Sequence, residues 1–446
     1  MCETTVPLQS SFAAFVGIDW GDKKHAWALQ AAGSSKIESG EIRSTPEAIQ
    51  EWITELQRRF PAGRMAIALE QSRGPLVFTL SKYEHLVLYP IHSSSAASYR
   101  KAFRPSGAKS DGPDAALHLD MLLRHRERMR PLNPDTAETR ALQLLTEDRR
   151  DLVDERTRYS NRLRADLKSY YPQVLQWFED PDAPVALDFL ERWPTLEELQ
   201  KTKPATWLKF FQEHRCRDEA KNQERVEAMR TAVTATTDFA VVTAGRAAAH
   251  AAVCLLRNLN VLIRGYDREI DQLTQAHPDF AIFDSLPGAG QVLVPRLIAA
   301  FGTQRDRYQH ASDIQQYSGI APVTEASGLQ FWVHWRWSCP KFLRQSFHEF
   351  AAQSILHCDW AEAYYRAQRD DNNKSHHAAV RSLAYKWIRI VFRCWQDHTP
   401  YDDAKYELAL KTRNGAPAQP KTSGPFELPI RWTSCGSFQK LALKNG

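Results

Sequence analysis

Four acidic residues have the spacing expected of a divalent-metal site. Asp19 ends the apolar run FAAFVGID, and Glu70 ends the apolar run MAIALE. Asp111 and Asp114 follow in KSDGPDA, three residues apart, so a helix that begins there would carry both on one face. Carboxylate and water oxygens are the ligands that Mg²⁺ prefers, and paired ions about 3.5–4 Å apart assist phosphoryl transfer. The set therefore predicts Mg²⁺-assisted chemistry on a phosphate ester, although for each acid taken singly a helix cap or a surface charge is the better interpretation.

The segments around these acids predict an α/β domain with a mixed sheet. Gly17, inside the first apolar run, indicates that another backbone approaches closely there. Thr45 and Pro46 supply an N-cap and a first-turn proline for one of the helices. Strands are expected over residues 12–19, 24–31, 35–43, 65–70 and 86–91, and helices over 45–59, 74–84, 94–103 and from about 113. This order of elements is typical of ribonuclease H-like domains.

The remainder of the chain is predicted to be mostly helical. Thr136 to Tyr171 contains no proline or glycine and would form a helix of about 54 Å. Its apolar stripe predicts packing against a helix of the same chain or a dimeric coiled coil, and the heptads are too irregular to choose. Further helices are expected over 217–235 and 239–276. The turn at residues 287–290, PGAG, is either a plain helix connection or a hairpin that holds a phosphate.

Composition describes a soluble intracellular protein of 446 residues. Lys and Arg number 58 and Asp and Glu 53, so the net charge of +5 is too small to establish nucleic-acid binding by itself. The seven cysteines contain no CxxC pair, which makes a zinc site unexpected and fits a reducing cytoplasm. The longest weakly polar run, near 247–256, is too short to span a bilayer. After Tyr401 the chain becomes rich in Pro, Gly and Lys and is predicted to be disordered.

Several short motifs occur in a fixed order: VGIDWG, ALEQSRG, KSDGPDA, LPGAG and YSGIAPVTEASG. Together they resemble the DEDD transposases of insertion sequences, a family that includes RNA-guided bridge recombinases. The resemblance covers roughly residues 12–130 and 283–400. It implies a RuvC-like domain whose metal-binding acids are Asp19, Glu70, Asp111 and Asp114, a helical coiled-coil region, and a second domain that supplies a serine nucleophile. It also implies donor and target DNA, a structured guide RNA, Mg²⁺, and assembly into a dimer or tetramer.

The resemblance leaves two candidates for the nucleophile. Ser327 precedes Gly328 shortly after the GIAP stretch, where the family carries its serine. Ser338 lies in WRWSCPKFLR, where this chain departs from the Gly-Asn pair of the common form. A serine hydroxyl must be activated before it can attack, and no His or Lys lies close to Ser327 in sequence. A serine before a glycine is also a frequent turn residue, so we expect Ser327 and keep Ser338 open.

Cations near the end of the second domain are candidates for phosphate contacts. Such contacts give salt-dependent affinity and positioning, whereas a solvated helix face is the alternative for each residue. Trp387 and Trp395 lie among these cations in sequence. The predicted nucleic-acid-binding residues are Lys341, Arg344, Arg381, Lys386 and Arg389, with Arg393 beside them.

We therefore expect a DEDD domain over residues 12–134, a helical region over 135–280, a serine-bearing domain over 281–402 and a basic tail over 403–446. The expected function is RNA-guided, serine-mediated transposition of an insertion sequence. One alternative is a nuclease of the Holliday-junction type that uses only the metal site, which would leave 283–400 unexplained. A second is an actin-like phosphotransferase, because VGIDWGDKK resembles a phosphate loop, but the second Asp-Gly-rich loop is missing. A third is a nucleic-acid-binding protein without catalysis, derived from a mobile element.

Overall fold

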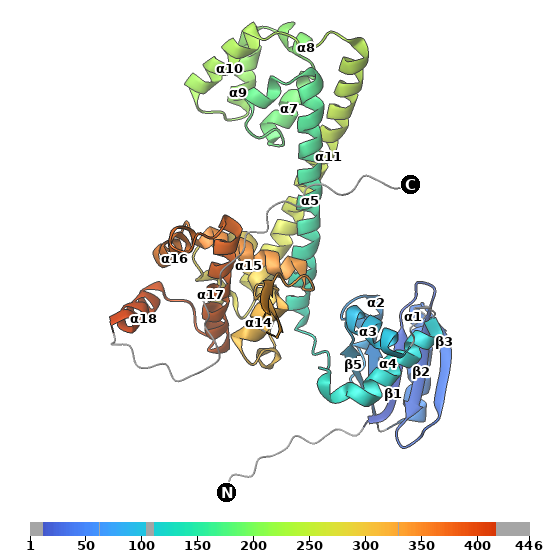
Figure 1. Ribbon diagram of the computed structural model, residues 1–446. Helices are drawn as coiled ribbons and strands as arrows, with labels where there is room; N and C mark the ends of the chain where they lie inside the picture. The colour runs from blue at the N-terminus through green and yellow to red at the C-terminus, as the bar shows by residue number, and fades with distance from the viewer. Residues whose placement is uncertain (1–11, 62, 104–110, 329, 416–446) are drawn as a thin grey trace. The chain divides into compact units, whose positions relative to one another are not determined.

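The computed structural model describes residues 12–61, 63–103, 111–328 and 330–415, and the chain divides into two compact units, 1–134 and 135–446 (Figure 1). The first unit is built on a five-stranded sheet in the order β3-β2-β1-β4-β5. β1 (Phe12–Asp19), β2 (Lys24–Ala31) and β3 (Ile37–Arg43) are antiparallel neighbours, whereas β4 (Arg64–Leu69) and β5 (Leu86–Pro90) continue parallel to β1. The predicted mixed α/β sheet is confirmed.

Helices cover both faces of this sheet. Apolar residues of α1 (Pro46–Arg59) and α2 (Pro75–Leu80) share one core cluster with alternate strand residues. α3 (Ser93–Phe103) and α4 (Asp111–His125) contribute to the clusters formed by the other strand residues. Thr45 caps α1, its hydroxyl accepting from the backbone N–H of Ala48. α2 is shorter than predicted because the chain turns after Leu80 to reach β5.

Two long antiparallel helices form the axis of the second unit (Figure 1). α5 (Ala137–Tyr170) and α11 (Phe239–Gln275) pack along one another, with Gly245 against the ring of Tyr170 at one end and Leu142 sharing a core with Ile270 at the other. The α5 stripe thus packs within the chain, which is one of the two predicted alternatives. Short helices fill the end of the pair near Tyr170: α6 (Val174–Trp177), α7 (Pro184–Arg192), α8 (Leu196–Gln200), α9 (Pro204–Glu213) and α10 (Glu219–Thr231).

Among the described residues, α11 is one helix whose length and composition would suffice to cross a membrane. The run near 247–256 was expected to be too short to span a bilayer, but it lies within this apolar helix of 37 residues. Ala249, Ala252, Val253 and Leu256 of α11 are buried in the core that α5 and the short helices share. Its apolar face therefore serves, at least in part, intramolecular packing.

The other end of the long pair carries a second helical core. Trp387 and Trp395 are at most 1% exposed and donate their indole N–H groups to the Ser354 hydroxyl and the Gly302 carbonyl. They are core residues, although their place among cations in the sequence suggested a surface. This part comprises α12 (Phe280–Asp284), α13 (Gly290–Phe301), α14 (Ala311–Tyr317), β6 (Val323–Ser327), β7 (Gln330–His334), α15 (Lys341–Ser354), α16 (Asp359–Asp370) and α17 (His376–Gln396).

A further helix, α18 (Asp403–Gly415), occupies the start of the segment predicted to be a disordered tail. That prediction was wrong for these residues. Tyr401 and Tyr406 pack at the rim of the helical core, and Tyr401 accepts the indole N–H of Trp360 while donating to Asp403. Aromatic contacts at the beginning of the helix therefore outweigh the polar composition that favoured disorder.

The PGAG turn between α12 and α13 is closely packed. Gly288 has a positive φ of 79°, and a Cβ at this position would lie 2.9 Å from the ring of His357 and 3.1 Å from the backbone of Gln353. Close packing therefore accounts for this glycine without a ligand. A phosphate at the turn stays a prediction.

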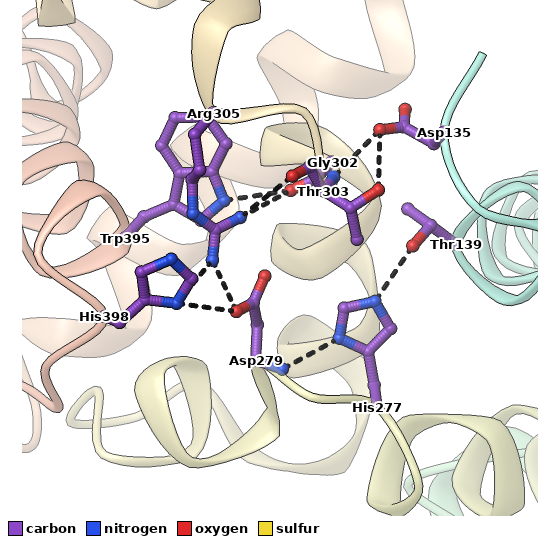
Figure 2. Close-up of polar contacts among 9 residues, drawn as sticks. All are labelled: Asp135, Thr139, His277, Asp279, Gly302, Thr303, Arg305, Trp395 and His398. Carbon is purple, nitrogen blue, oxygen red and sulfur yellow. Dashed lines mark hydrogen bonds and ion pairs between the residues drawn. The ribbon is translucent and has the colours of Figure 1, made fainter.

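A polar network ties the beginning of α5 to this core (Figure 2). Arg305 donates to Asp279 at 2.5 Å and stacks over the ring of Trp395. Asp135 accepts from the Thr303 backbone at 2.8 Å, and His277 contacts the Thr139 hydroxyl at 2.9 Å. Each of these contacts joins segments far apart in sequence, so the network fixes where the long helix leaves the core.

Candidate active site

The two strand-end acids lie side by side in the first unit. β1 and β4 are parallel neighbours, and Ile18 is opposite Leu69 in their register. Asp19 and Glu70 are the next residues of the two strands, so both emerge at the carboxyl edge of the sheet. Carboxylates gathered at this edge are well placed to hold a cation. The expected adjacency of the first two acids is therefore present.

Gly17 allows α4 to lie directly on β1. A Cβ at this position would lie 2.2 Å from the carbonyl oxygen of Ala115 and 2.4 Å from the backbone nitrogen of Leu119. No side chain fits in that space without moving backbone, in agreement with the close approach expected from the sequence. The contact brings the α4 residues Asp114 and His118 to the edge where β1 and β4 end.

Asp114 is buried and paired with a cation. Its side chain is 4% exposed, and its Oδ1 accepts from Arg100 Nε of α3 at 2.8 Å. The second oxygen, Oδ2, is buried and has no hydrogen-bond partner in the described part of the chain. A buried carboxylate oxygen without a partner is costly, so this atom is suited to a cation or to an ordered water.

His118 joins the acids at the same edge and was not anticipated from the sequence. Its ring is fully buried, and its Nδ1–H donates to the carbonyl of Ile18 at 2.9 Å. The other ring nitrogen, Nε2, lies 3.6 Å from Glu70 Oε1 and has no hydrogen-bond partner among the described residues. If the ring is neutral, Nε2 presents a lone pair to the carboxylate, and a proton or a metal cation between the two groups would stabilise the contact.

The donor atoms fit a divalent cation in chemical type. Glu70, Asp114 and His118 offer oxygen and imidazole donors, and two of their buried atoms have no partner in the described segments. Over those same segments, however, no three such side chains converge closely enough to form a closed ligand set. Asp111 is the first residue of α4, and its side chain lies outside the described residues. The described residues therefore gather oxygen and nitrogen donors at one edge without closing a ligand set.

Ser327 lies at the tip of a hairpin in the second unit. It ends β6, pairs with Gln330 of β7 and is exposed. Gly328 follows with a positive φ of 59°, which explains the Ser-Gly order as a turn requirement. Within the described residues, no His or Lys is hydrogen-bonded to the Ser327 hydroxyl. The hairpin presents this serine to solvent.

Ser338 lies in the segment that connects β7 to α15. A Cβ at Gly319, in the GIAP stretch, would lie 2.4 Å from Cys339 Sγ, and the Cys339 thiol donates to the carbonyl of Arg336. The GIAP stretch therefore packs against this connection and holds the base of the hairpin. Ser338 is exposed, as is Ser327, and burial does not choose between them.

The predicted phosphate-binding cations differ in their surroundings. Lys341 and Arg389 are exposed and Arg344 is half-buried, whereas Arg381 is only 8% exposed. The Lys386 ammonium lies over the rings of Trp360 and Tyr364, at 4.7 and 4.5 Å from their centroids. Lys341 and Arg389 are therefore accessible to a phosphate, whereas the Lys386 ammonium already contacts two aromatic rings.

Two family models match the chain. Residues 16–172 match a model of DEDD transposases, and residues 281–366 match the model of the IS116/IS110/IS902 transposase family. The first match begins in β1 and ends just after α5, and the second contains the hairpin with both candidate serines. The chain belongs to this family of insertion-sequence transposases. Transposases of this family cut and rejoin DNA, which makes the protein an enzyme of DNA transposition.

Similar proteins extend over almost the whole transposase. The mini-circle putative transposase for IS117 of Streptomyces coelicolor is 27% identical over 406 residues, which are 89% of this chain and 97% of that protein. An uncharacterized 44.8 kDa protein of the insertion element IS116 of Streptomyces clavuligerus is 27% identical over 395 residues, 86% and 94% of the two chains. An uncharacterized 42 kDa protein of IS900 from Mycobacterium paratuberculosis is 24% identical over 405 residues, 87% and 97% of the two chains.

Proposed function

We propose that this transposase exchanges DNA strands through a serine nucleophile, assisted by Mg²⁺ on a RuvC-like carboxylate site. The observation that carries the proposal is the edge of the first sheet, where Asp19 and Glu70 follow paired residues of neighbouring parallel strands. The strand order of that sheet and the four acids in family order support the RuvC-like assignment.

The acids have distinct roles in this proposal. Asp19 and Glu70 hold the cation from the strand ends, and Asp114 adds from the helix its Oδ2, which has no partner among the described residues. Asp111, from the same helix, completes the set. Mg²⁺ bound there would neutralise and polarise the scissile phosphate. His118 is a positioning residue that orients Glu70 from the buried side.

Ser327 is the proposed nucleophile. Its Oγ attacks the phosphorus, its proton leaves to a base, and the displaced strand departs with a free hydroxyl. A hydroxyl of the incoming strand then attacks the phosphoserine ester and releases the serine. The phosphodiester energy is retained in the intermediate, so exchange needs no external energy source. Ser338 remains the second candidate.

The proposed partners are donor DNA, target DNA and a structured guide RNA, with several copies of the chain in one assembly of two or four. The support for the guide RNA and the assembly is the family resemblance, while the exposed cations Lys341 and Arg389 support phosphate contacts. Arg344, Arg381 and Lys386 are proposed to line the same nucleic-acid surface.

Strand exchange by purified carboxylate variants tests the metal assignment. Asp19→Asn, Glu70→Gln, Asp111→Asn and Asp114→Asn should each abolish exchange while leaving the thermal midpoint close to that of the wild type. Glu41→Gln, an exposed acid paired with Lys24 on the same sheet, is the matched control and should keep exchange. Exchange at the wild-type rate in the Asp19 and Glu70 variants would refute the site.

A nuclease that uses water is the second candidate function. The observation in its favour is that the described residues include no His or Lys bonded to the Ser327 hydroxyl. Cut DNA without joined products, unchanged in Ser327→Ala, would favour this candidate.

A further inference from the structure

Three tryptophans lie exposed within six residues, one in β7 of the hairpin that carries Ser327 and two just after that strand. Trp332 is 44% exposed, Trp335 is 41% exposed and Trp337 is 81% exposed. Tryptophan is normally well buried, so exposed rings gathered in one short segment usually mark a binding surface. The sequence offered no sign that these tryptophans, rather than Trp387 and Trp395, reach solvent.

Arginines accompany the exposed rings. The guanidinium of Arg381, from α17, stacks over the ring of Trp335, and that of Arg344, from α15, lies 6.0 Å from the same ring. Arg336 lies between Trp335 and Trp337 in sequence. In the described ranges, none of these three arginines is ion-paired with a carboxylate. The buried Arg381 therefore packs against the ring of Trp335, and the half-buried Arg336 and Arg344 accompany the exposed tryptophans.

The guanidinium of Arg381 is buried with some of its hydrogen-bond donors unused among the described residues. Its Nε and one terminal nitrogen are buried and have no hydrogen-bond partner among the described residues. Burial, together with the nearby charge of Arg344, lowers the pKa of the Arg381 guanidinium to about 9. A buried cation beside another cation is costly unless an anion approaches, so this part of the surface favours a negatively charged ligand.

We propose that Trp335 and Trp337, with Arg336, Arg344 and Arg381, bind unpaired nucleotides of the DNA strand next to the scissile phosphate. Aromatic faces stack on bases of any sequence, and arginines track the backbone between them. An apolar protein partner would leave the arginines without a counter-charge.

The hairpin register places this surface close to Ser327. Ser327 is at the tip, and Val323 pairs with His334 at the base, just before Trp335. Four residue steps of a strand are about 14 Å, so bases on the platform belong to nucleotides near the one held at Ser327. The assignment of the bound strand as DNA rests on the proposed role of Ser327 as the nucleophile. The prediction that this surface binds single-stranded nucleic acid does not depend on that role.

Equilibrium binding in EDTA tests the platform without any reaction. The full-length protein would be titrated into a labelled oligo(dT) of about 12 nucleotides, a duplex of equal length and an oligo(rU) of equal length. Trp335→Ala and Trp337→Ala should weaken oligo(dT) binding about tenfold each, and duplex binding less than twofold. Phe239→Ala is the matched control, since Phe239 is 82% exposed at the start of α11 and should bind like the wild type.

Each outcome decides between the alternatives. Trp337→Ala is informative even if Trp335→Ala unfolds, because the Trp337 side chain is almost fully exposed. Equal losses on duplex and single strand, or no loss in Trp337→Ala, would overturn the platform. If oligo(rU) binds more tightly than oligo(dT), and the tryptophan substitutions weaken only oligo(rU) binding, the DNA assignment would be overturned in favour of RNA. Because EDTA prevents metal-dependent cleavage, an inactive Ser327 or metal site would leave the result unchanged.

Discussion

His118 Nε2 lies 3.6 Å from Glu70 Oε1 and has no hydrogen-bond partner among the described residues. The orientation follows from the other side of the ring, where Nδ1–H donates to the Ile18 carbonyl. One helix residue thereby connects the end of β1 to the acid at the end of β4. A proton or a metal cation placed between Nε2 and the carboxylate would stabilise this contact.

His118→Gln should therefore weaken divalent-cation binding. Loss of a group that orients or joins the ligands of a metal typically costs 10- to 100-fold in affinity. Titration of the metal-free protein with Mn²⁺, followed by paramagnetic resonance, measures this directly. His92→Gln, an exposed histidine near the start of α3, is the control. An unchanged dissociation constant in His118→Gln would show that His118 serves only packing.

Gly17→Ala should destabilise the first unit because its methyl group would meet the α4 backbone 2.2 Å away. Overpacking of this kind costs about 1–3 kcal/mol. Gly265→Ala is the matched control, since a Cβ at that position in α11 would have nothing within 4 Å and alanine favours helices by up to about 1 kcal/mol. Urea unfolding of both variants tests the contrast, and equal midpoints would contradict the close approach of α4 to β1.

Arg100→Met should destabilise the protein by about 3 kcal/mol, because it leaves the buried Asp114 carboxylate without its cation. Millimolar Mg²⁺ should restore part of that loss, since a cation that binds only the folded state stabilises it. Thermal unfolding with and without Mg²⁺ measures both effects. Arg58→Met, which removes an exposed pair with Glu55, should change the midpoint little. A variant as stable as the wild type would contradict the pairing.

Acidification should weaken the network at the beginning of α5. Burial lowers the pKa of His277 below its usual 6.5, and Nδ1 must stay unprotonated to accept from the Asp279 backbone. Below pH 6.5 the unfolded chain binds a proton that the folded chain does not, so stability falls as the pH decreases from 6.5 toward the folded pKa. The slope is at most about 1.4 kcal/mol per pH unit for one group.

His277→Gln should reduce that pH dependence. Urea unfolding between about pH 7.5 and 5.5 compares the variant with the wild type. His250→Gln, an exposed histidine on α11, should keep the wild-type slope. Parallel curves for His277→Gln and the wild type would assign the pH dependence to other groups.

Much of the first unit could be predicted because its signals are local. The apolar run before Asp19 is fully buried on alternate positions, and Gly17 marks the place where a helix backbone approaches. The pairing of Asp114 with Arg100 could not be predicted, because it depends on how α3 and α4 pack. His118 was missed for the same reason, since a single histidine in a helix carries no sign of what its ring faces.

The aromatic residues of the second unit show a different limit of sequence-based prediction, which is the separation of buried rings from exposed ones. Trp387 and Trp395 have cations as sequence neighbours yet point into the core, whereas Trp335 and Trp337 come after a short exposed hairpin and reach solvent. Helical periodicity alone did not separate a buried stripe from a charged face where both are rich in Trp and Arg. The exposed set became visible only from the packing.

Trapping of a protein–DNA intermediate tests the central claim most directly. The protein would be incubated with its candidate flanking RNA, end-labelled target DNA and Mg²⁺, and analysed on a denaturing gel beside Ser327→Ala, Ser338→Ala and Asp19→Asn. Serine-mediated exchange predicts a protein-linked DNA band in the wild type and in Ser338→Ala that is absent from Ser327→Ala and Asp19→Asn. Cut DNA with no linked protein in any lane would contradict the serine mechanism, and a band lost only in Ser338→Ala would move the nucleophile to the segment after β7.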